Sequence, residues 1–144
     1  MSGLATETLH AEHVSLSEHV EHMRLAAREL PELSAEERTQ LFARILDFLQ
    51  GTLIPHAEAE ERGLYEGVAK LLGDERATAP MLYDHRAIRE WVADLAATPI
   101  DDIPRLQELL YGLYALIEVH FRKEEELYLP LVELLWVVGP SWRA

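Results

Sequence analysis

The apolar residues of this chain recur at helical spacing in four long segments, and this periodicity restricts the folds open to it. Leucine, isoleucine, valine and methionine stand three or four positions apart in each segment, which places them on one face of an α-helix. Only seven glycines and seven prolines interrupt the chain, and they cluster at a few places. No segment alternates polar and apolar residues as a half-buried strand does. The pattern predicts an all-α protein.

Residues at the segment ends predict where the helices begin and end. Pro31 ends the first helix, because a proline ring removes a backbone donor and clashes with the preceding turn. Ser34, followed three residues later by Glu37, forms a capping box at the start of the second. Pro55 lies within that helix and is expected to kink it without breaking it, because Gly51 four residues earlier leaves local slack. The predicted helices cover residues 6–30, 34–72, 80–98 and 102–137.

Four helices with one apolar stripe each and short connections most economically form an antiparallel up-down-up-down four-helix bundle. A chain of 144 residues has room for one such domain, which we assign to residues 1–144 with a core at about 6–137. The stripe of the last helix is expected to continue inward as far as Leu127.

Composition narrows the functional classes. The chain has 13 lysines and arginines against 26 aspartates and glutamates, and this net charge of −13 repels nucleic-acid phosphates. It has no cysteine, so any metal must be held by histidine and carboxylate. No apolar run reaches the roughly 20 residues of a membrane span, and no signal peptide is visible. We therefore expect a cytoplasmic protein without nucleic-acid or membrane partners.

Histidine and glutamate interrupt two of the apolar stripes, at positions where leucine or isoleucine is expected. His56 precedes Glu60 by four positions on the second helix, and His120 precedes Glu124 by four on the fourth. This spacing puts imidazole and carboxylate on one helix face, one turn apart. Both pairs can therefore reach an ion in the interior of the bundle.

The chain repeats this arrangement around two single histidines. His19 precedes His56 by 37 positions, His85 precedes His120 by 35, and each single histidine follows an acidic residue. A pseudo-twofold bundle brings these groups together, and burial of carboxylates within apolar stripes favours a cation beside them. Imidazole and carboxylate donors suit iron, manganese or zinc, and the twofold arrangement suits two ions. The predicted metal ligands are His19, His56, Glu60, His85, His120 and Glu124.

The order of these residues resembles the ligand string of the hemerythrin-like family, also called the His-His-Glu cation-binding domain. The resemblance spans about Leu16 to Leu134, and Pro130 with its preceding Leu-Tyr-Leu is similar to the usual ending of the family. It implies a non-haem di-iron centre in which the four histidines are terminal ligands. Glu60 and Glu124 would then bridge the two irons beside an oxo or hydroxo group.

The resemblance also implies a function. It indicates a protein that binds or reacts with dioxygen, nitric oxide or hydrogen peroxide in oxidative or nitrosative stress. The sequence is compatible with a monomer or a homodimer. Two alternatives stay open, a catalase-like di-iron enzyme that disproportionates peroxide and an iron sensor or iron donor. Zinc and manganese accept the same donors as iron.

One position departs from the oxygen carriers of that family. They have a fifth histidine one turn before the single histidine of the third helix, and Met81 stands at that place. The change argues against reversible oxygen carriage and leaves a position open for a small ligand or a substitute side chain. His22 and the phenols of Tyr83, Tyr111 and Tyr114 are the candidate substitutes.

Four further residues adjoin the predicted site or resemble its members. Glu61 and Glu125 follow the proposed bridging glutamates and could replace them, although helical phase favours the bridging pair. His10 and His13 lie near the start of the chain, where solvated surface is expected.

Overall fold

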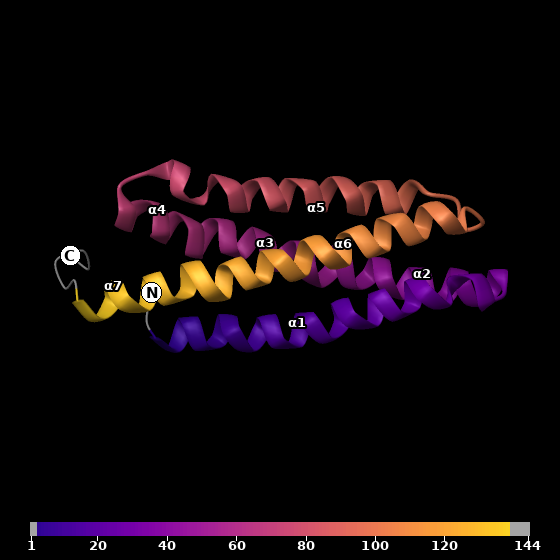
Figure 1. Ribbon diagram of the computed structural model, residues 1–144, viewed down its shortest axis with the longest axis horizontal. Helices are drawn as coiled ribbons and strands as arrows, with labels where there is room; N and C mark the ends of the chain where they lie inside the picture. Colours follow the sequence, from indigo (N-terminus) through magenta and orange to yellow (C-terminus); the bar gives the residue numbers. More distant parts are fainter. Residues whose placement is uncertain (1–2, 139–144) are drawn as a thin grey trace.

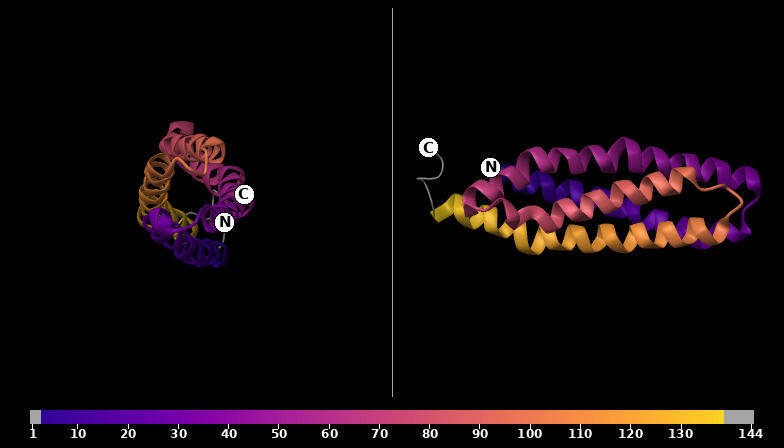
Figure 2. Two further views of the ribbon diagram at one scale, coloured as in Figure 1. Left: turned by 90° about the vertical axis from the view of Figure 1, so that its right-hand side faces the viewer. Right: turned by 90° about the horizontal axis from the view of Figure 1, so that it is seen from above.

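The computed structural model describes residues 3–138, with side chains described for residues 6–134. Four helical rods lie along one another and alternate in direction, and no strand occurs in this part of the chain (Figure 1). Seen end on, the rods surround a common centre (Figure 2). The prediction of an all-α, up-down-up-down four-helix bundle is confirmed.

The first and third rods are single helices, α1 (Gly3–Glu29) and α5 (Ala79–Ala97). The second rod runs through α2 (Ala35–Phe48), the π turn η2 (Leu49–Leu53), α3 (Ile54–Glu60), the π turn η3 (Glu61–Tyr65) and α4 (Glu66–Leu72). The fourth rod runs through α6 (Ile103–Lys123), the π turn η5 (Glu124–Tyr128) and α7 (Leu129–Val138). Short 3-10 turns, η1 (Leu30–Glu32) and η4 (Glu75–Thr78), form part of the connections.

The ends of the rods carry the capping residues that the sequence predicts. The Ser34 hydroxyl accepts a hydrogen bond from the backbone N–H of Glu37 at 3.2 Å. The Asp102 carboxylate accepts one from the backbone N–H of Arg105 at 3.3 Å. Gly73 ends α4 in the left-handed conformation, with φ of 65°, where a side chain would be strained. Predicted and observed rod ends agree within one turn.

Three π turns shift the helical phase on the two rods that carry the His–Glu pairs. A π turn contains more residues than an α-helical turn, so each one rotates the side chains that follow it. The second rod continues through Pro55 directly after η2, as predicted. On the fourth rod, η5 leaves Leu127 61% exposed and buries Leu129. The expectation that Leu127 points inward is wrong, because it assumed an uninterrupted α-helix.

Two apolar clusters fill the bundle, one toward each end. The larger includes Leu30, Leu49 and Leu106 and occupies the end opposite the chain termini. The smaller includes Met81 and Leu129 and lies toward the termini. On every rod a short stretch between members of the two clusters contains buried polar side chains. These stretches contain the residues singled out by the sequence pattern, with the exception of His19.

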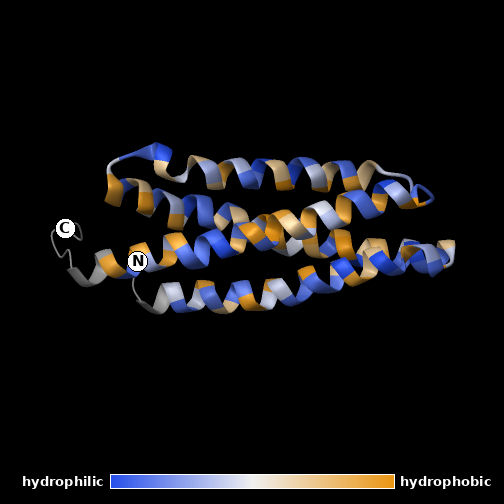
Figure 3. Ribbon diagram, viewed as in Figure 1, coloured by the Kyte–Doolittle hydropathy of each residue, from blue (hydrophilic) through white to orange (hydrophobic). Residues whose placement is uncertain are grey.

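Polar and apolar residues share every rod (Figure 3). The buried residues are largely apolar, whereas most charged residues are exposed or half-buried. Within residues 3–138, no helix is both long enough and apolar enough to span a membrane.

Candidate metal centre

All four rods contribute to one buried polar layer between the two apolar clusters, which we call the histidine–carboxylate layer. Its members are His13 of α1, His56 and Glu60 of α3, His85 of α5, His120 of α6 and Glu124 of η5. The side chain of His56 is 9% exposed, and the other five residues are at most 3% exposed. Five of these six residues are among the predicted ligands, and His13 is not.

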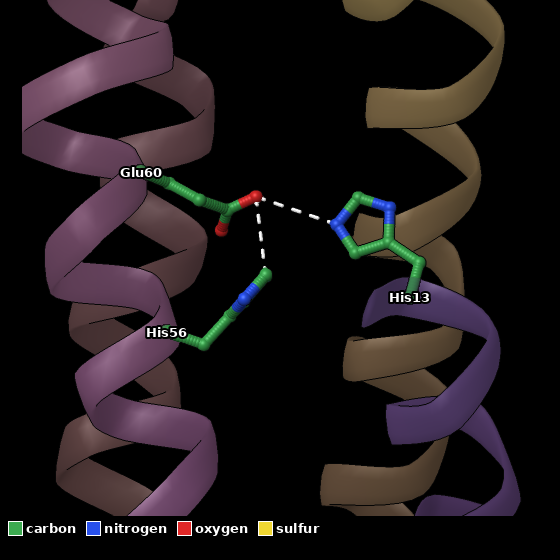
Figure 4. Close-up of side chains that lie close together, drawn as sticks. All are labelled: His13, His56 and Glu60. Atoms are coloured by element: carbon green, nitrogen blue, oxygen red, sulfur yellow. Dashed lines mark hydrogen bonds and ion pairs between the residues drawn. The ribbon is translucent and has the colours of Figure 1, made fainter. Parts of the chain in front are cut away.

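One group of three donors brings α1 and α3 together (Figure 4). Oε2 of Glu60 lies 3.4 Å from Nε2 of His13 and 3.4 Å from Nε2 of His56. The His13 ring stacks on Phe121 with 4.8 Å between the ring centroids, which fixes its orientation. One donor atom from each of these three residues lies within 4.8 Å of the others, so one ion could contact all three.

A second group of donors adjoins the first and shares Glu60 with it. Oε1 of Glu60 lies 3.4 Å from Nε2 of His85, which lies 2.9 Å from Nε2 of His120. Oε1 of Glu124 lies 3.0 Å from Nε2 of His120 and 3.6 Å from Nε2 of His13, so this carboxylate also reaches both groups. The two oxygens of Glu60 thus face different histidines, which suits a carboxylate shared by two ions.

The chemistry of these donors fits a cation. Nε2 of His56, Oε1 of Glu60 and Oε1 of Glu124 are buried without a hydrogen-bond partner of good geometry. Buried polar atoms are normally paired, and leaving a charged one unpaired is costly. A positive ion would satisfy all three atoms and would separate the imidazole nitrogens of His85 and His120, which now face each other.

His13 and His85 each bind a carboxylate outside the layer through Nδ1, the ring nitrogen that faces away from the layer. Nδ1 of His13 donates to Glu125 at 2.7 Å, and Nδ1 of His85 donates to Glu61 at 2.9 Å. Because a carboxylate can only accept, each of these imidazoles has a proton on Nδ1, and its Nε2 faces the layer. Arg89 also donates to Glu61, at 2.8 Å. Glu61 and Glu125 therefore orient His85 and His13 from outside the layer.

The histidines of the two His–Glu pairs are held in the same way. Nδ1 of His56 donates to Glu12 at 3.0 Å, and Nδ1 of His120 donates to Asp84 at 2.9 Å. Burial opposes ionisation of Asp84, but hydrogen bonds from Lys123 and His120 outweigh it and lower its pKa. Glu12 directly precedes His13 in the sequence, and Asp84 directly precedes His85. In each half of the chain, the acidic residue before one histidine of the layer thus orients the histidine of the following His–Glu pair. All four imidazoles present the same nitrogen inward.

The charges within the layer are unbalanced without a metal. Burial raises the pKa of Glu60, but the adjacent His13, His56 and His85 outweigh burial and bring the pKa far below its usual value. Burial and the neighbouring Glu60 raise the pKa of Glu124 to about 7. Burial lowers the pKa of His13, but the surrounding glutamates outweigh this effect and raise it to about 9. Protons on Glu124 and His13 thus stand where a metal ion would supply positive charge.

Tyr65 also reaches the layer, although the sequence pattern did not indicate it. Its hydroxyl donates to Oε2 of Glu124 at 3.2 Å and lies 3.2 Å from Nε2 of both His85 and His120. Burial and the nearby Glu60 and Glu124 raise its pKa well above the usual value, so the phenol keeps its proton. The π turn η3 explains the omission, because it turns both Leu64 and Tyr65 inward.

The structure places His13 in the layer and His19 outside it. His19 is exposed, and its ring stacks on Phe48 with 5.0 Å between the centroids. The expectation that His13 is solvated surface is wrong, because only 3% of it is exposed. A sequence signal was present: His13 follows Leu9 by four positions and precedes Leu16 by three, so it lies on the apolar stripe.

Unequal rod lengths explain why the repeat pointed to His19, whereas the structure places His13 in the layer. His13 lies 16 positions before the end of α1, whereas His85 lies 12 positions before the end of α5. His56 lies 21 positions after the start of α2, whereas His120 lies 17 positions after the start of α6. Each rod of the first half is therefore about one turn longer. Nearly equal spacing in the two halves, which favoured His19, does not hold.

The other candidate substitutes lie away from the layer. His22 is exposed, as are Tyr83 and Tyr111, which are 65% and 39% exposed. Tyr114 is half-buried beneath the guanidinium of Arg24, 5.7 Å from the ring centroid. Met81 is fully buried in the smaller apolar cluster, which also contains Tyr65. The side chain that reaches the layer from that cluster is therefore Tyr65.

Comparison with known families agrees with this geometry. The family model of the hemerythrin HHE cation-binding domain matches residues 4–132, which include every member of the histidine–carboxylate layer. No curated protein and no solved structure matches the chain significantly.

Proposed function

Because this chain belongs to the hemerythrin HHE cation-binding domain family, we propose that its layer holds two iron ions that bind or react with dioxygen, nitric oxide or hydrogen peroxide. The observation that carries the proposal is the position of Glu60, whose two oxygens face different histidines 3.4 Å away. His13 and His56 would hold one ion, and His85 and His120 the other. Glu60 and Glu124 would be shared.

Iron is the proposed metal because the donors are four imidazoles and two carboxylates, without thiolate. Two bound irons would supply electrons for the reduction of a small oxidant. The chain itself supplies orientation, since outer carboxylates hold all four imidazoles, and a proton, since Tyr65 keeps one at Oη. Water is restricted by burial of the layer between two apolar clusters.

The proposal is tested on protein reconstituted with ferrous iron under anaerobic conditions. Addition of dioxygen, nitric oxide or hydrogen peroxide in separate samples should change the ultraviolet and visible absorption spectrum. Glu124→Ala should abolish the response, whereas Glu126→Ala, in the same π turn but exposed, should respond as the wild type does. An iron-loaded wild type that responds to none of the three molecules would refute the proposal.

A catalase-like activity is the second candidate, and the position of Tyr65 favours it. Disproportionation of peroxide requires protons to be moved, and the Tyr65 hydroxyl lies 3.2 Å from Glu124 and two imidazoles. This candidate predicts dioxygen release from hydrogen peroxide that decreases strongly in Tyr65→Phe. If the same variant binds nitric oxide normally, the phenol serves peroxide chemistry and not ligand binding in general.

A further inference from the structure

A cavity of about 660 Å³ lies beside the histidine–carboxylate layer, between the end of the second rod and the start of the third. Ala69 and Lys70 of α4, Thr78 of η4 and Leu82 of α5 are among its lining residues. The cavity is open to solvent at its rim, where Leu82 is 41% exposed, while Thr78 in its wall is 3% exposed. It therefore extends from the surface to buried side chains.

Two side chains connect this cavity to the layer. Tyr65 lines the cavity, and its hydroxyl lies 3.2 Å from Nε2 of His85 and of His120. Glu61 also lines the cavity and accepts the hydrogen bond from Nδ1 of His85. Tyr65 is only 2% exposed, so its side chain separates the cavity from the donor nitrogens. A molecule that passes this side chain arrives at the layer.

The charge of the cavity wall selects among small molecules. Its lining includes four carboxylates and one ammonium group, from Glu61, Glu66, Asp74, Glu75 and Lys70. Asp74 and Glu61 are each paired with an arginine, so the negative charge at the entrance comes from the exposed carboxylates of Glu66 and Glu75, which outnumber the ammonium group of Lys70. Such a wall repels small anions at low ionic strength and is indifferent to uncharged molecules.

We propose that this cavity is the entry route to the metal centre, that Tyr65 controls passage through it, and that its acidic wall favours small uncharged ligands over anions. This inference rests on the proposed function. The buried position of Tyr65 limits passage to molecules of a few atoms, because its ring must move to admit them. Diatomic gases and hydrogen peroxide meet both requirements.

Rates of ligand entry test the proposal in the iron-loaded protein. Ala69→Trp should fill the cavity and slow nitric oxide binding in stopped-flow measurements by about tenfold or more, with iron content unchanged. Ala93→Trp is the matched control, since Ala93 is an exposed helical alanine that does not line the cavity. Leu82→Trp narrows the rim and should act in the same direction if Ala69→Trp fails to fold. Unchanged rates in both cavity variants would overturn the proposal.

Charge variants test the selection against anions. The double variant Glu66→Gln with Glu75→Gln should speed azide binding several-fold at low ionic strength and leave nitric oxide binding unchanged. Glu90→Gln, at an exposed position of α5 outside the cavity, should affect neither ligand. If azide binds the double variant at the wild-type rate, the acidic wall does not select against anions.

A readout without iron separates this proposal from the proposed function. Dissolved dioxygen is paramagnetic and should shorten the NMR relaxation time of the Thr78 methyl more than those of the Leu110 methyls, which are also buried but do not line the cavity. Ala69→Trp should remove the difference. Equal relaxation of the two methyls in the wild type would show that the cavity admits no dioxygen. If the chain holds no iron but the difference is present, the proposed function fails, although the cavity still admits dioxygen.

Discussion

Nε2 of His13 lies 3.4 Å from Oε2 of Glu60, although the two residues are 47 positions apart in the chain. The contact joins the first rod to the second at the level of the other histidines. It also completes a set of four imidazoles, one from each rod, around two buried carboxylates. A two-ion centre with two imidazoles for each ion requires this pair.

Replacement of His13 should remove metal, whereas replacement of His19 should not. His13→Ala deletes a donor of the group that contains His56 and Glu60, so iron should fall from about two ions per chain to about one or fewer. His19→Ala deletes an exposed ring outside the layer and serves as the matched control. Elemental analysis of both reconstituted variants decides the matter. Equal losses in the two variants, or a loss only in His19→Ala, would contradict the assignment.

The outer carboxylates should tune metal affinity without being ligands. Glu125→Gln replaces the group that accepts the hydrogen bond from Nδ1 of His13, and such changes typically weaken metal binding about 10- to 100-fold. Glu126→Gln alters an exposed neighbour and should leave affinity unchanged. Competition with a chelator of known affinity measures the difference. An affinity of Glu125→Gln equal to that of the wild type would mean that the hydrogen bond does not orient the ligand.

Much of the fold could be predicted because its determinants are local. The capping box of Ser34 and Glu37 and the left-handed Gly73 act over a few residues, and the structure has both. The α-helical period alone was sufficient to predict that the two His–Glu pairs lie on inner helix faces. The choice between His13 and His19 was different, since it depended on the relative lengths of rods that are distant in sequence.

The π turns account for the remaining differences. A uniform helical period places Leu127 inward and gives no reason for Tyr65 to join Leu64 in the core. The structure inserts η3 after Glu60 and η5 at Glu124, and each turn changes the residues that face inward. The two turns share no glycine or proline pattern that would predict them from the sequence. Helical periodicity alone therefore could not predict that Tyr65 faces the layer.

Removal of the metal should destabilise the protein. A ligand that binds only the folded state at 1,000 times its dissociation constant adds about 4 kcal/mol, which for a chain of this size corresponds to a change in Tm on the order of 10 °C. Chelation should therefore lower Tm by an amount of this order, and His120→Ala should lose most of the metal-dependent increase. A Tm that does not respond to metal would exclude both the two-ion centre and the iron-sensor alternative.

The metal-free protein should lose stability as pH rises from about 6.5 to about 9. The pKa of His13 is about 9 in the folded protein and 6.5 in the unfolded chain, so its proton stabilises the fold below pH 6.5. That contribution, about 3 kcal/mol at most, disappears as pH rises through 9. The raised pKa values of His56 and His120 act in the same direction. Urea denaturation at several pH values measures the loss.

Metal binding should show the opposite dependence on pH. A cation must displace the protons on His13 and Glu124, so affinity should rise with pH and binding should release protons into a weakly buffered solution. His13→Ala should reduce both effects, and His19→Ala should reduce neither. Proton-independent binding would indicate that the metal lies outside the histidine–carboxylate layer.

Anomalous X-ray diffraction at the iron edge, from crystals of the reconstituted protein, tests the central claim most directly. We expect two iron peaks, one at coordination distance from His13 and His56 and the other from His85 and His120, with Glu60 in contact with both. A single peak, a peak beside His19, or no peak in a chain that has been exposed to excess ferrous iron would contradict it.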